Sequence, residues 1–112
     1  MELNTERLNG ILFVEAWERV DGTNARSFEE ALRNATKGDE RGVVIDFSSL
    51  TYISSAGLRV MLIAARMLKQ QNATFAVCNL SGPVRSVFEI SGFDRIIPVH
   101  SSRDGALSSM SS

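Results

Sequence analysis

The chain has 112 residues, of which 44% are apolar, so it is long enough for one domain with a hydrophobic core. Its 12 basic and 13 acidic residues give a formal net charge of −1, and no basic cluster with interleaved aromatic residues argues for nucleic acid as a partner. No apolar run approaches the roughly 20 residues that span a bilayer, and the first residues lack a signal-peptide pattern, so we expect a cytoplasmic protein with no membrane partner.

The first part of the chain predicts a β-hairpin followed by a helix. Asn9 and Gly10 are typical of a tight turn, and the β-forming run at 11–17 predicts a strand that pairs back on the residues before it. The polar segment 18–23 is expected to end this strand. Asn24 or Ser27 can then cap a helix, whose apolar positions are Phe28, Ala31, Leu32 and Ala35.

The middle of the chain predicts a strand, a short bridge and a second helix. Residues 43–47 form a compact β-branched run, which is typical of a buried strand. From residue 58 onward, apolar residues recur every three or four positions, which predicts an amphipathic helix. Its expected apolar stripe consists of Leu58, Met61, Leu62, Ala65 and Leu68.

The last part continues the alternation. Residues 73–80 predict a strand, Pro83 suits the first turn of a further helix, and Gly92 is expected to end that helix. Residues 96–99 predict the last strand. We expect a short helix over 104–107 and a frayed, serine-rich tail over 108–112.

This order of elements predicts the fold class. Strands that alternate with helices after an opening hairpin indicate an α/β fold with a mixed sheet of four to five strands and about four helices packed on it. No internal repeat or long linker divides the chain, so we expect a single domain over 1–112 with an ordered core of roughly 2–107. In such sheets, functional groups collect beyond the C-terminal ends of the strands.

The sequence contains no recognisable set of catalytic residues. The one histidine, His100, follows the last expected strand, and no Gly-x-Ser-x-Gly elbow or phosphate-binding loop is present. One histidine and one cysteine make no metal site. Asp21 and Asp46 could lie near one turn as a carboxylate pair, although capping of turns and strand ends explains them better. We therefore expect no enzyme, no metal and no cofactor.

The two serines between the central strand and the following helix, Ser54 and Ser55, are instead the candidate functional residues. Ser55 stands at the expected N-cap, where free N–H groups and the positive end of the helix dipole favour an anion. Phosphorylation there would add about −1.5 to −2 charges that the fold tolerates but a docked partner does not. The alternative is that Ser55 is a plain structural cap, as N-cap serines usually are.

The segment 44–58, which reads VIDFSSLTYISSAGL, resembles the signature of STAS domains and is similar to that of the bacterial anti-sigma-factor antagonists. Residues 19–25, 78–84 and 88–93 resemble further segments of that family, so the likeness covers roughly 2–107. It implies the STAS fold for the chain.

The resemblance also implies site residues. The family motif usually reads Asp-Ser-[Ser/Thr]-Gly with its first serine phosphorylated, and placing its glycine on Gly57 puts the phosphoacceptor on Ser55. Ser54 then stands in place of the aspartate and remains a rival acceptor, while Ala56 replaces the second hydroxyl residue. We favour Ser55 because it is expected to hold the cap position. Partner contacts are expected from Asp21, Thr23, Asn24, Ser54, Ser55, Ala56, Gly57 and Arg59.

The implied function is partner switching. The unphosphorylated protein would bind an anti-sigma factor that is also a GHKL-type serine kinase, and so release the kinase's client. Phosphorylation of Ser55 would abolish binding, and a metal-dependent serine phosphatase would reverse it. The protein would be a monomer or a weak dimer. The alternative is a non-switching STAS scaffold or accessory subunit in a signalling or transport assembly, in which Ser55 is only a cap.

Overall fold

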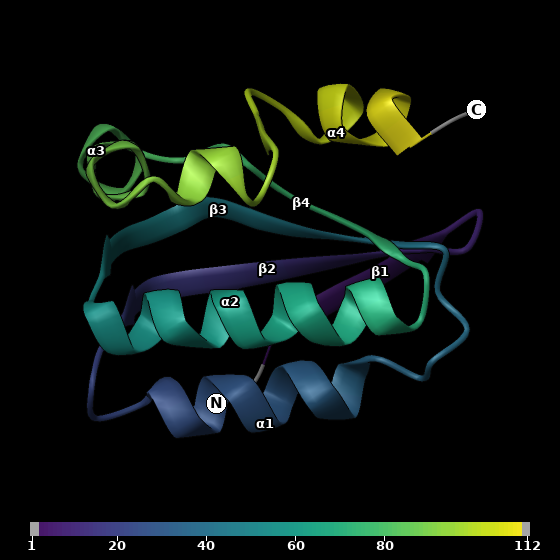
Figure 1. Cartoon of the computed structure of the whole chain (residues 1–112), viewed down its shortest axis with the longest axis horizontal. Coiled ribbons are helices and arrows are strands. Elements are labelled where there is room, and N and C mark those ends of the chain that lie inside the picture. The colour runs from purple at the N-terminus through teal and green to yellow at the C-terminus, as the bar shows by residue number, and fades with distance from the viewer. Residues whose placement is uncertain (1–2, 111–112) are drawn as a thin grey trace.

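A computed structural model describes residues 3–110, which fold around one five-stranded sheet (Figure 1). The strands lie in the order β1-β2-β3-β4-β5, and β1 is antiparallel to β2 while the other neighbours are parallel. The sheet is therefore mixed, as the sequence predicts. Its strands are β1 (Asn4–Leu8), β2 (Ile11–Val20), β3 (Gly42–Ile53), β4 (Thr74–Cys78) and β5 (Val99–His100).

The helices alternate with the parallel strands, and α1 and α2 lie side by side (Figure 1). In α2, Leu58, Met61 and Leu68 of the predicted apolar stripe are buried. Leu62 and Ala65 of that stripe are only half-buried, and Val60 and Ala64 are buried instead. The segment after α3 forms one turn of 3₁₀ helix. The bounds are α1 (Ala25–Ala35), α2 (Ser55–Gln70), α3 (Gly82–Ser91), η1 (Phe93–Arg95) and α4 (Arg103–Met110).

Alternate residues of the strands supply two hydrophobic cores on opposite faces of the sheet. The larger core packs the sheet against α1, α2 and α3, and its largest side chains include Phe28, Phe47, Met61 and Phe88. The smaller core lies under α4 and includes Phe13, Val44, Cys78, Ala106 and Met110. Burial in this core, together with the nearby charge of Asp46, raises the pKa of the Cys78 thiol to about 11.

The strands β2 and β3 run further than the sequence predicts. Strand β2 continues through 18–20 to Val20, and β3 continues to Ile53, so the expected break and short bridge are wrong. Pairing between the two strands persists across register shifts at Glu15/Trp17 and Glu18/Arg19. The backbone of Glu18 has a φ of 59°, which absorbs one such irregularity.

The C-terminal part differs from the prediction in two respects. Only Val99 of the predicted last strand 96–99 lies in a strand, because Ile97 turns into the larger core after η1 and the strand comprises Val99 and His100. Residues 108–110 are helical and not frayed, since Met110 is buried in the smaller core at the end of α4. Residues 111–112 of the predicted tail, and residue 2 of the predicted ordered core, lie outside the described residues.

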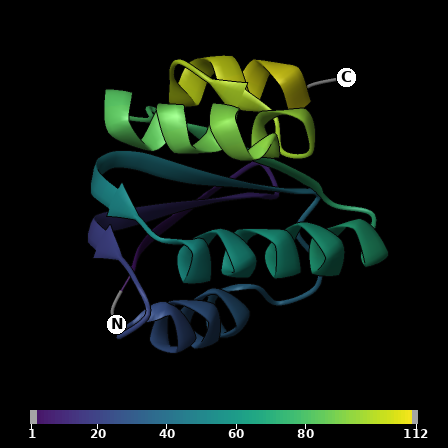
Figure 2. The same ribbon diagram turned by 60° about the vertical axis from the view of Figure 1, so that its left-hand side comes forward.

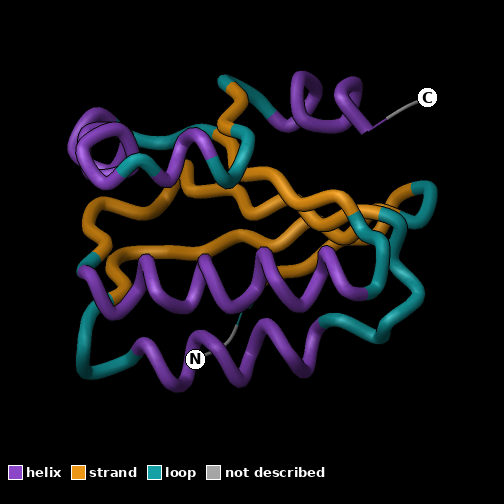
Figure 3. The backbone as a smooth tube through the Cα atoms, viewed as in Figure 1, coloured by secondary structure: helices purple, strands orange, loops and turns teal. Residues whose placement is uncertain are grey.

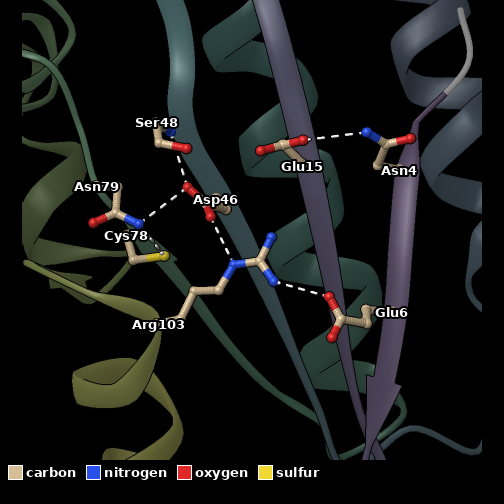
Figure 4. Close-up of polar contacts among 8 residues, drawn as sticks. All are labelled: Asn4, Glu6, Glu15, Asp46, Ser48, Cys78, Asn79 and Arg103. Carbon is tan, nitrogen blue, oxygen red and sulfur yellow. Dashed lines mark hydrogen bonds and ion pairs between the residues drawn. The ribbon is translucent and has the colours of Figure 1, made fainter.

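A polar network fastens α4 to the sheet (Figure 4). The Asp46 carboxylate accepts hydrogen bonds from Arg103 Nε at 2.7 Å, the Ser48 amide at 2.9 Å and Asn79 Nδ2 at 3.1 Å. Arg103 also contacts Glu6 on β1 at 3.2 Å. Burial would raise the pKa of Asp46, but these hydrogen bonds outweigh burial and lower it.

The positions of Asp21 and Asp46 exclude the suggested carboxylate pair. Asp46 is paired in register with Glu15, whereas Asp21 follows Val20, which is paired with Ile53. Asp46 and Ile53 are seven residues apart on β3, so the two carboxylates are separated by about 20 Å along the strands. The expectation that they could lie near one turn is wrong.

Candidate functional site

The candidate site lies at the edge of the sheet where β2 and β3 end and α1 and α2 begin (Figure 3). Val20 and Ile53 are the last paired residues of these strands. The Ser54 amide donates a hydrogen bond to the Val20 carbonyl at 2.8 Å, which ties the beginning of α2 to the end of β2. The turn after β2 and the turn after β3 are therefore held side by side.

Ser54 is the N-cap of α2. Its backbone is extended, with φ −91° and ψ 175°, and its hydroxyl accepts a hydrogen bond from the Gly57 amide at 3.3 Å. Its carbonyl accepts the Leu58 amide at 2.9 Å. The prediction that Ser55 holds the cap position is wrong, because the hydrogen bond to Val20 keeps Ser54 in extended backbone and Ser55 is the first helical residue.

Ser55 is exposed on the first turn of α2, whereas Ser54 is only half-exposed. The Ser55 hydroxyl makes no hydrogen bond to any residue between 3 and 110. It is thus an accessible nucleophilic oxygen at the positively polarised end of a 16-residue helix. A charged group on this oxygen would lie in solvent and not in the core.

Gly57 allows α2 to begin close to the strand ends. A Cβ atom at this position would lie 2.7 Å from Ile53 Cγ1 and 2.9 Å from Val20 Cγ1, and both of those side chains are buried. Ala56 beside it is half-buried. A larger residue at 57 would push the helix and its two serines away from the sheet.

Asp21, Thr23 and Asn24 form the neighbouring turn between β2 and α1. The Asp21 carboxylate accepts hydrogen bonds from the Thr23 hydroxyl at 2.6 Å and the Thr23 amide at 2.9 Å, and it pairs with Arg19 at 2.9 Å. Led by the Thr23 hydroxyl, these contacts lower the pKa of Asp21. Asn24 Oδ1 accepts the Asp21 amide at 2.9 Å, so the turn is internally braced while Thr23 stays exposed.

Arg59 is exposed one turn further along α2, beside Ser55. The two residues border a shallow hollow of about 290 Å³, whose other lining residues are Leu58, Leu62 and Phe93. The site residues inferred from the sequence therefore lie on α2 and on the adjoining β2–α1 turn. Phe93 was not predicted from the sequence; it reaches this surface from η1, 38 residues further along the chain than Ser55.

An aromatic contact at this edge was not predicted from the sequence either. Tyr52 is 47% exposed at the end of β3, and the Arg19 guanidinium lies 5.1 Å from the centre of its ring. Arg19 thereby links Tyr52 to Asp21. The aromatic residue directly before the Ile-Ser-Ser segment was the only signal in the sequence that could have drawn attention to it.

The described residues offer little to other kinds of site. Between residues 3 and 110, no three or more His, Cys, Asp or Glu side chains come together as metal ligands. No helix in that range combines the length and apolar character needed to cross a bilayer. His100 lies in β5, half-buried, with Nε2 3.3 Å from the Ser109 hydroxyl.

Comparison with known proteins gives a consistent picture. The sequence model of the STAS domain matches residues 2–106. The chain is 42% identical over 106 residues to BtrV of Bordetella bronchiseptica, a protein named as a candidate anti-sigma factor antagonist, and the match covers 95% of this chain and 91% of that one.

Two solved structures share the fold. An anti-sigma factor antagonist from Mycobacterium paratuberculosis superposes with a TM-score of 0.87 at 22% identity, covering 96% of this chain and 92% of that one. The antagonist SpoIIAA in its unphosphorylated form gives a TM-score of 0.78 at 17% identity, with 96% and 94% covered. At these identities the likeness concerns the fold alone.

Proposed function

The chain belongs to the STAS domain family, and we propose that it is an anti-sigma factor antagonist that acts by partner switching. The match to BtrV, at 42% identity over nearly the full length of both chains, supports the antagonist role. One structural observation carries the switch: the Ser55 hydroxyl is exposed at the beginning of α2 and free of hydrogen bonds within the described residues.

In its unphosphorylated state, the protein binds an anti-sigma factor through the edge of the sheet described above. The contact surface comprises the exposed parts of two adjoining segments. These are the β2–α1 turn with Asp21, Thr23 and Asn24, and the start of α2 with Ser54, Ser55, Ala56 and Arg59. Gly57, which was also expected to contact the partner, is buried and instead holds the start of α2 close to the strand ends. Binding the anti-sigma factor releases its client.

The anti-sigma factor is also a serine kinase of the GHKL type. The Ser55 oxygen attacks the γ-phosphorus of the kinase's ATP, a new O–P bond forms, and the bond to the β-phosphate oxygen breaks. The hydroxyl proton passes to a base of the kinase, and ADP leaves. The antagonist contributes only the acceptor oxygen, so it is no enzyme and requires no cofactor.

The fold supports a switch that does not rearrange the domain. The phosphate would project into solvent from the first turn of α2, where the helix dipole and free N–H groups favour negative charge. Ser54, not Ser55, supplies the capping hydrogen bond, so modifying Ser55 leaves the cap intact. The docking surface, in contrast, gains about −1.5 to −2 charges, which ejects the partner.

A metal-dependent serine phosphatase resets the protein by transferring the phosphoryl group to water. We also propose that residues 1–112 act as one STAS domain in the cytoplasm, as a monomer or weak dimer. If Ser55 is never phosphorylated, the chain instead acts as a constitutive STAS scaffold or accessory subunit.

The acceptor is tested by incubating the protein with the GHKL-type kinase of the same organism and ATP, and measuring its mass. We expect an increase of about 80 Da in the unsubstituted protein and in Ser54→Ala, and none in Ser55→Ala. Phosphorylation of Ser55→Ala at Ser54 would contradict the assignment of the acceptor.

A further inference from the structure

A groove runs along α2 from the proposed switch toward the C-terminal end of the helix. The hollow beside Ser55 and a second hollow of about 330 Å³ share the side chain of Leu62, so they adjoin along α2, beside the segment around η1. In Figure 2, α2 lies across the front of the molecule with α3 above it. We call the two adjoining hollows together the α2 groove; its apolar lining comprises Leu58, Leu62, Ala65, Ala73, Phe75, Phe93 and Ile96.

The apolar lining of the groove is accessible. Ile96 is 56% exposed, although a large aliphatic side chain normally avoids water. Leu62 and Phe93 are half-buried, so each still presents part of its surface to the groove. The α2 groove extends from Ser55 to Lys69, about 21 Å along the helix axis, which matches roughly four turns of a partner helix.

The rim of the groove is positively charged. Arg59, Arg66 and Lys69 line the hollows from α2, and all three are exposed. Within the described part of the chain, none of them has a carboxylate partner. Helix α2 itself contains no Asp or Glu in its 16 residues, whereas the protein as a whole carries a net charge of −1.

An apolar floor beneath a row of cations selects a particular kind of ligand. An amphipathic helix could place apolar residues on the floor at helical spacing and carboxylates opposite the rim. A strand would need an exposed sheet edge for its backbone hydrogen bonds, which the side of α2 does not offer. A lipid or anionic surface would need an open convex face, whereas these cations border a concave one.

We therefore propose that the α2 groove receives an acidic amphipathic helix of the anti-sigma factor. This inference rests on the proposed function only for the identity of the partner. It also gives the switch a physical target, because Ser55 and Arg59 lie one turn apart at one end of the groove. A phosphate on Ser55 would neutralise Arg59 and repel the acidic helix.

The test measures binding of four variants to the purified anti-sigma factor of the same organism. Arg66→Glu reverses a rim charge, and Lys37→Glu makes the same charge change at an exposed lysine after α1 that lines neither hollow. Ile96→Asp places a charge in the floor of the groove. Its control, Ile90→Asp, makes the same substitution at an 88% exposed isoleucine that lines neither hollow. Circular dichroism melting curves establish that all four variants fold.

We expect Arg66→Glu and Ile96→Asp to weaken binding about 10-fold or more, and the two controls to change it by less than about 3-fold. Added salt should weaken binding of the unsubstituted protein more steeply than that of Arg66→Glu. Carbodiimide coupling should join Lys69 to a carboxylate in a partner segment with helical apolar spacing. Coupling to a segment without that spacing would overturn the proposed helix.

The outcomes separate this inference from the function on which it rests. If Ser55→Asp abolishes binding while the groove variants bind like the controls, the groove is overturned and the switch stands. If the groove variants lose affinity while Ser55→Asp keeps it, the switch is overturned and the groove stands. Failure of the unsubstituted protein to bind the anti-sigma factor at all would overturn both.

Discussion

The Ser54 hydroxyl accepts a hydrogen bond from the Gly57 amide at 3.3 Å, which leaves the neighbouring hydroxyl of Ser55 free of any structural task in the described residues. Two adjacent serines thus have separate roles. Ser54 holds the helix terminus against the strand ends, while Ser55 presents its oxygen to solvent. A modification can then change the surface without loosening the fold beneath it.

This division of roles predicts different stability effects for two matched substitutions. Ser54→Ala removes the capping oxygen and should lower the free energy of unfolding by about 1 kcal/mol. Ser55→Ala removes an exposed, unbonded hydroxyl and should change it by less than about 0.5 kcal/mol. Urea unfolding followed by circular dichroism measures both, and a larger loss for Ser55→Ala would contradict the cap assignment.

Gly57 and Gly82 provide a second matched pair. Gly57→Ala would place Cβ 2.7 Å from Ile53 Cγ1, so we expect a loss of about 1–3 kcal/mol in the free energy of unfolding. Gly82 opens α3, and a methyl group added there would meet no atom of a more distant residue within 4 Å, so Gly82→Ala should be neutral or slightly stabilising. Equal effects in thermal or urea unfolding would argue against close packing at Gly57.

The ion pair between Asp46 and Arg103 should couple α4 to the sheet. Arg103→Met leaves the buried Asp46 carboxylate without its 2.7 Å partner and should cost about 1–3 kcal/mol. Asp46→Asn removes the charge that needs pairing, so the double variant should lose less than the sum of the two single losses. A double-mutant cycle by urea unfolding checks this, and strict additivity would contradict direct coupling.

The lowered pKa of Glu40 should make the free energy of unfolding depend on pH. Burial would raise its pKa, but hydrogen bonds from the Lys37 amide and from Arg7 and Gln71 outweigh burial and lower the pKa from 4.5 to about 2. The ionised group therefore stabilises the folded protein above about pH 4.5, and this contribution is lost as the pH falls toward 2.

The matched variant for this prediction is Glu40→Gln, which cannot ionise. Its free energy of unfolding should fall less steeply than that of the unsubstituted protein as the pH falls from 4.5 toward 2. Urea unfolding at a series of pH values provides the comparison. Identical pH dependence of the two proteins would show that Glu40 titrates alike in the folded and unfolded states.

Local signals in the sequence predicted much of the fold. Asn9 and Gly10 have positive φ values of 54° and 81°, as a tight hairpin turn requires, and Gly92 ends α3 with a φ of 77°. The alternation of strands and helices predicted the fold class, because each element has its own period of apolar residues in the sequence. These features depend on neighbours in the chain.

The features that the sequence could not predict depend on contacts between distant segments. Polar residues such as Ser49 and Tyr52 lie in β3 because β2 pairs alongside them. The choice between Ser54 and Ser55 as the cap depends on the hydrogen bond from Ser54 to Val20. The α2 groove was not visible because Phe93 and Ile96 join α2 only in the folded chain.

The central claim is that negative charge at residue 55 ejects the partner without unfolding the domain. Its most direct test is calorimetric titration of the anti-sigma factor with the unsubstituted protein, Ser55→Ala and Ser55→Asp, each verified as folded by circular dichroism. We predict binding by the first two and a loss of about 100-fold or more for Ser55→Asp. Unchanged affinity of a folded Ser55→Asp would contradict the account and favour a constitutive scaffold.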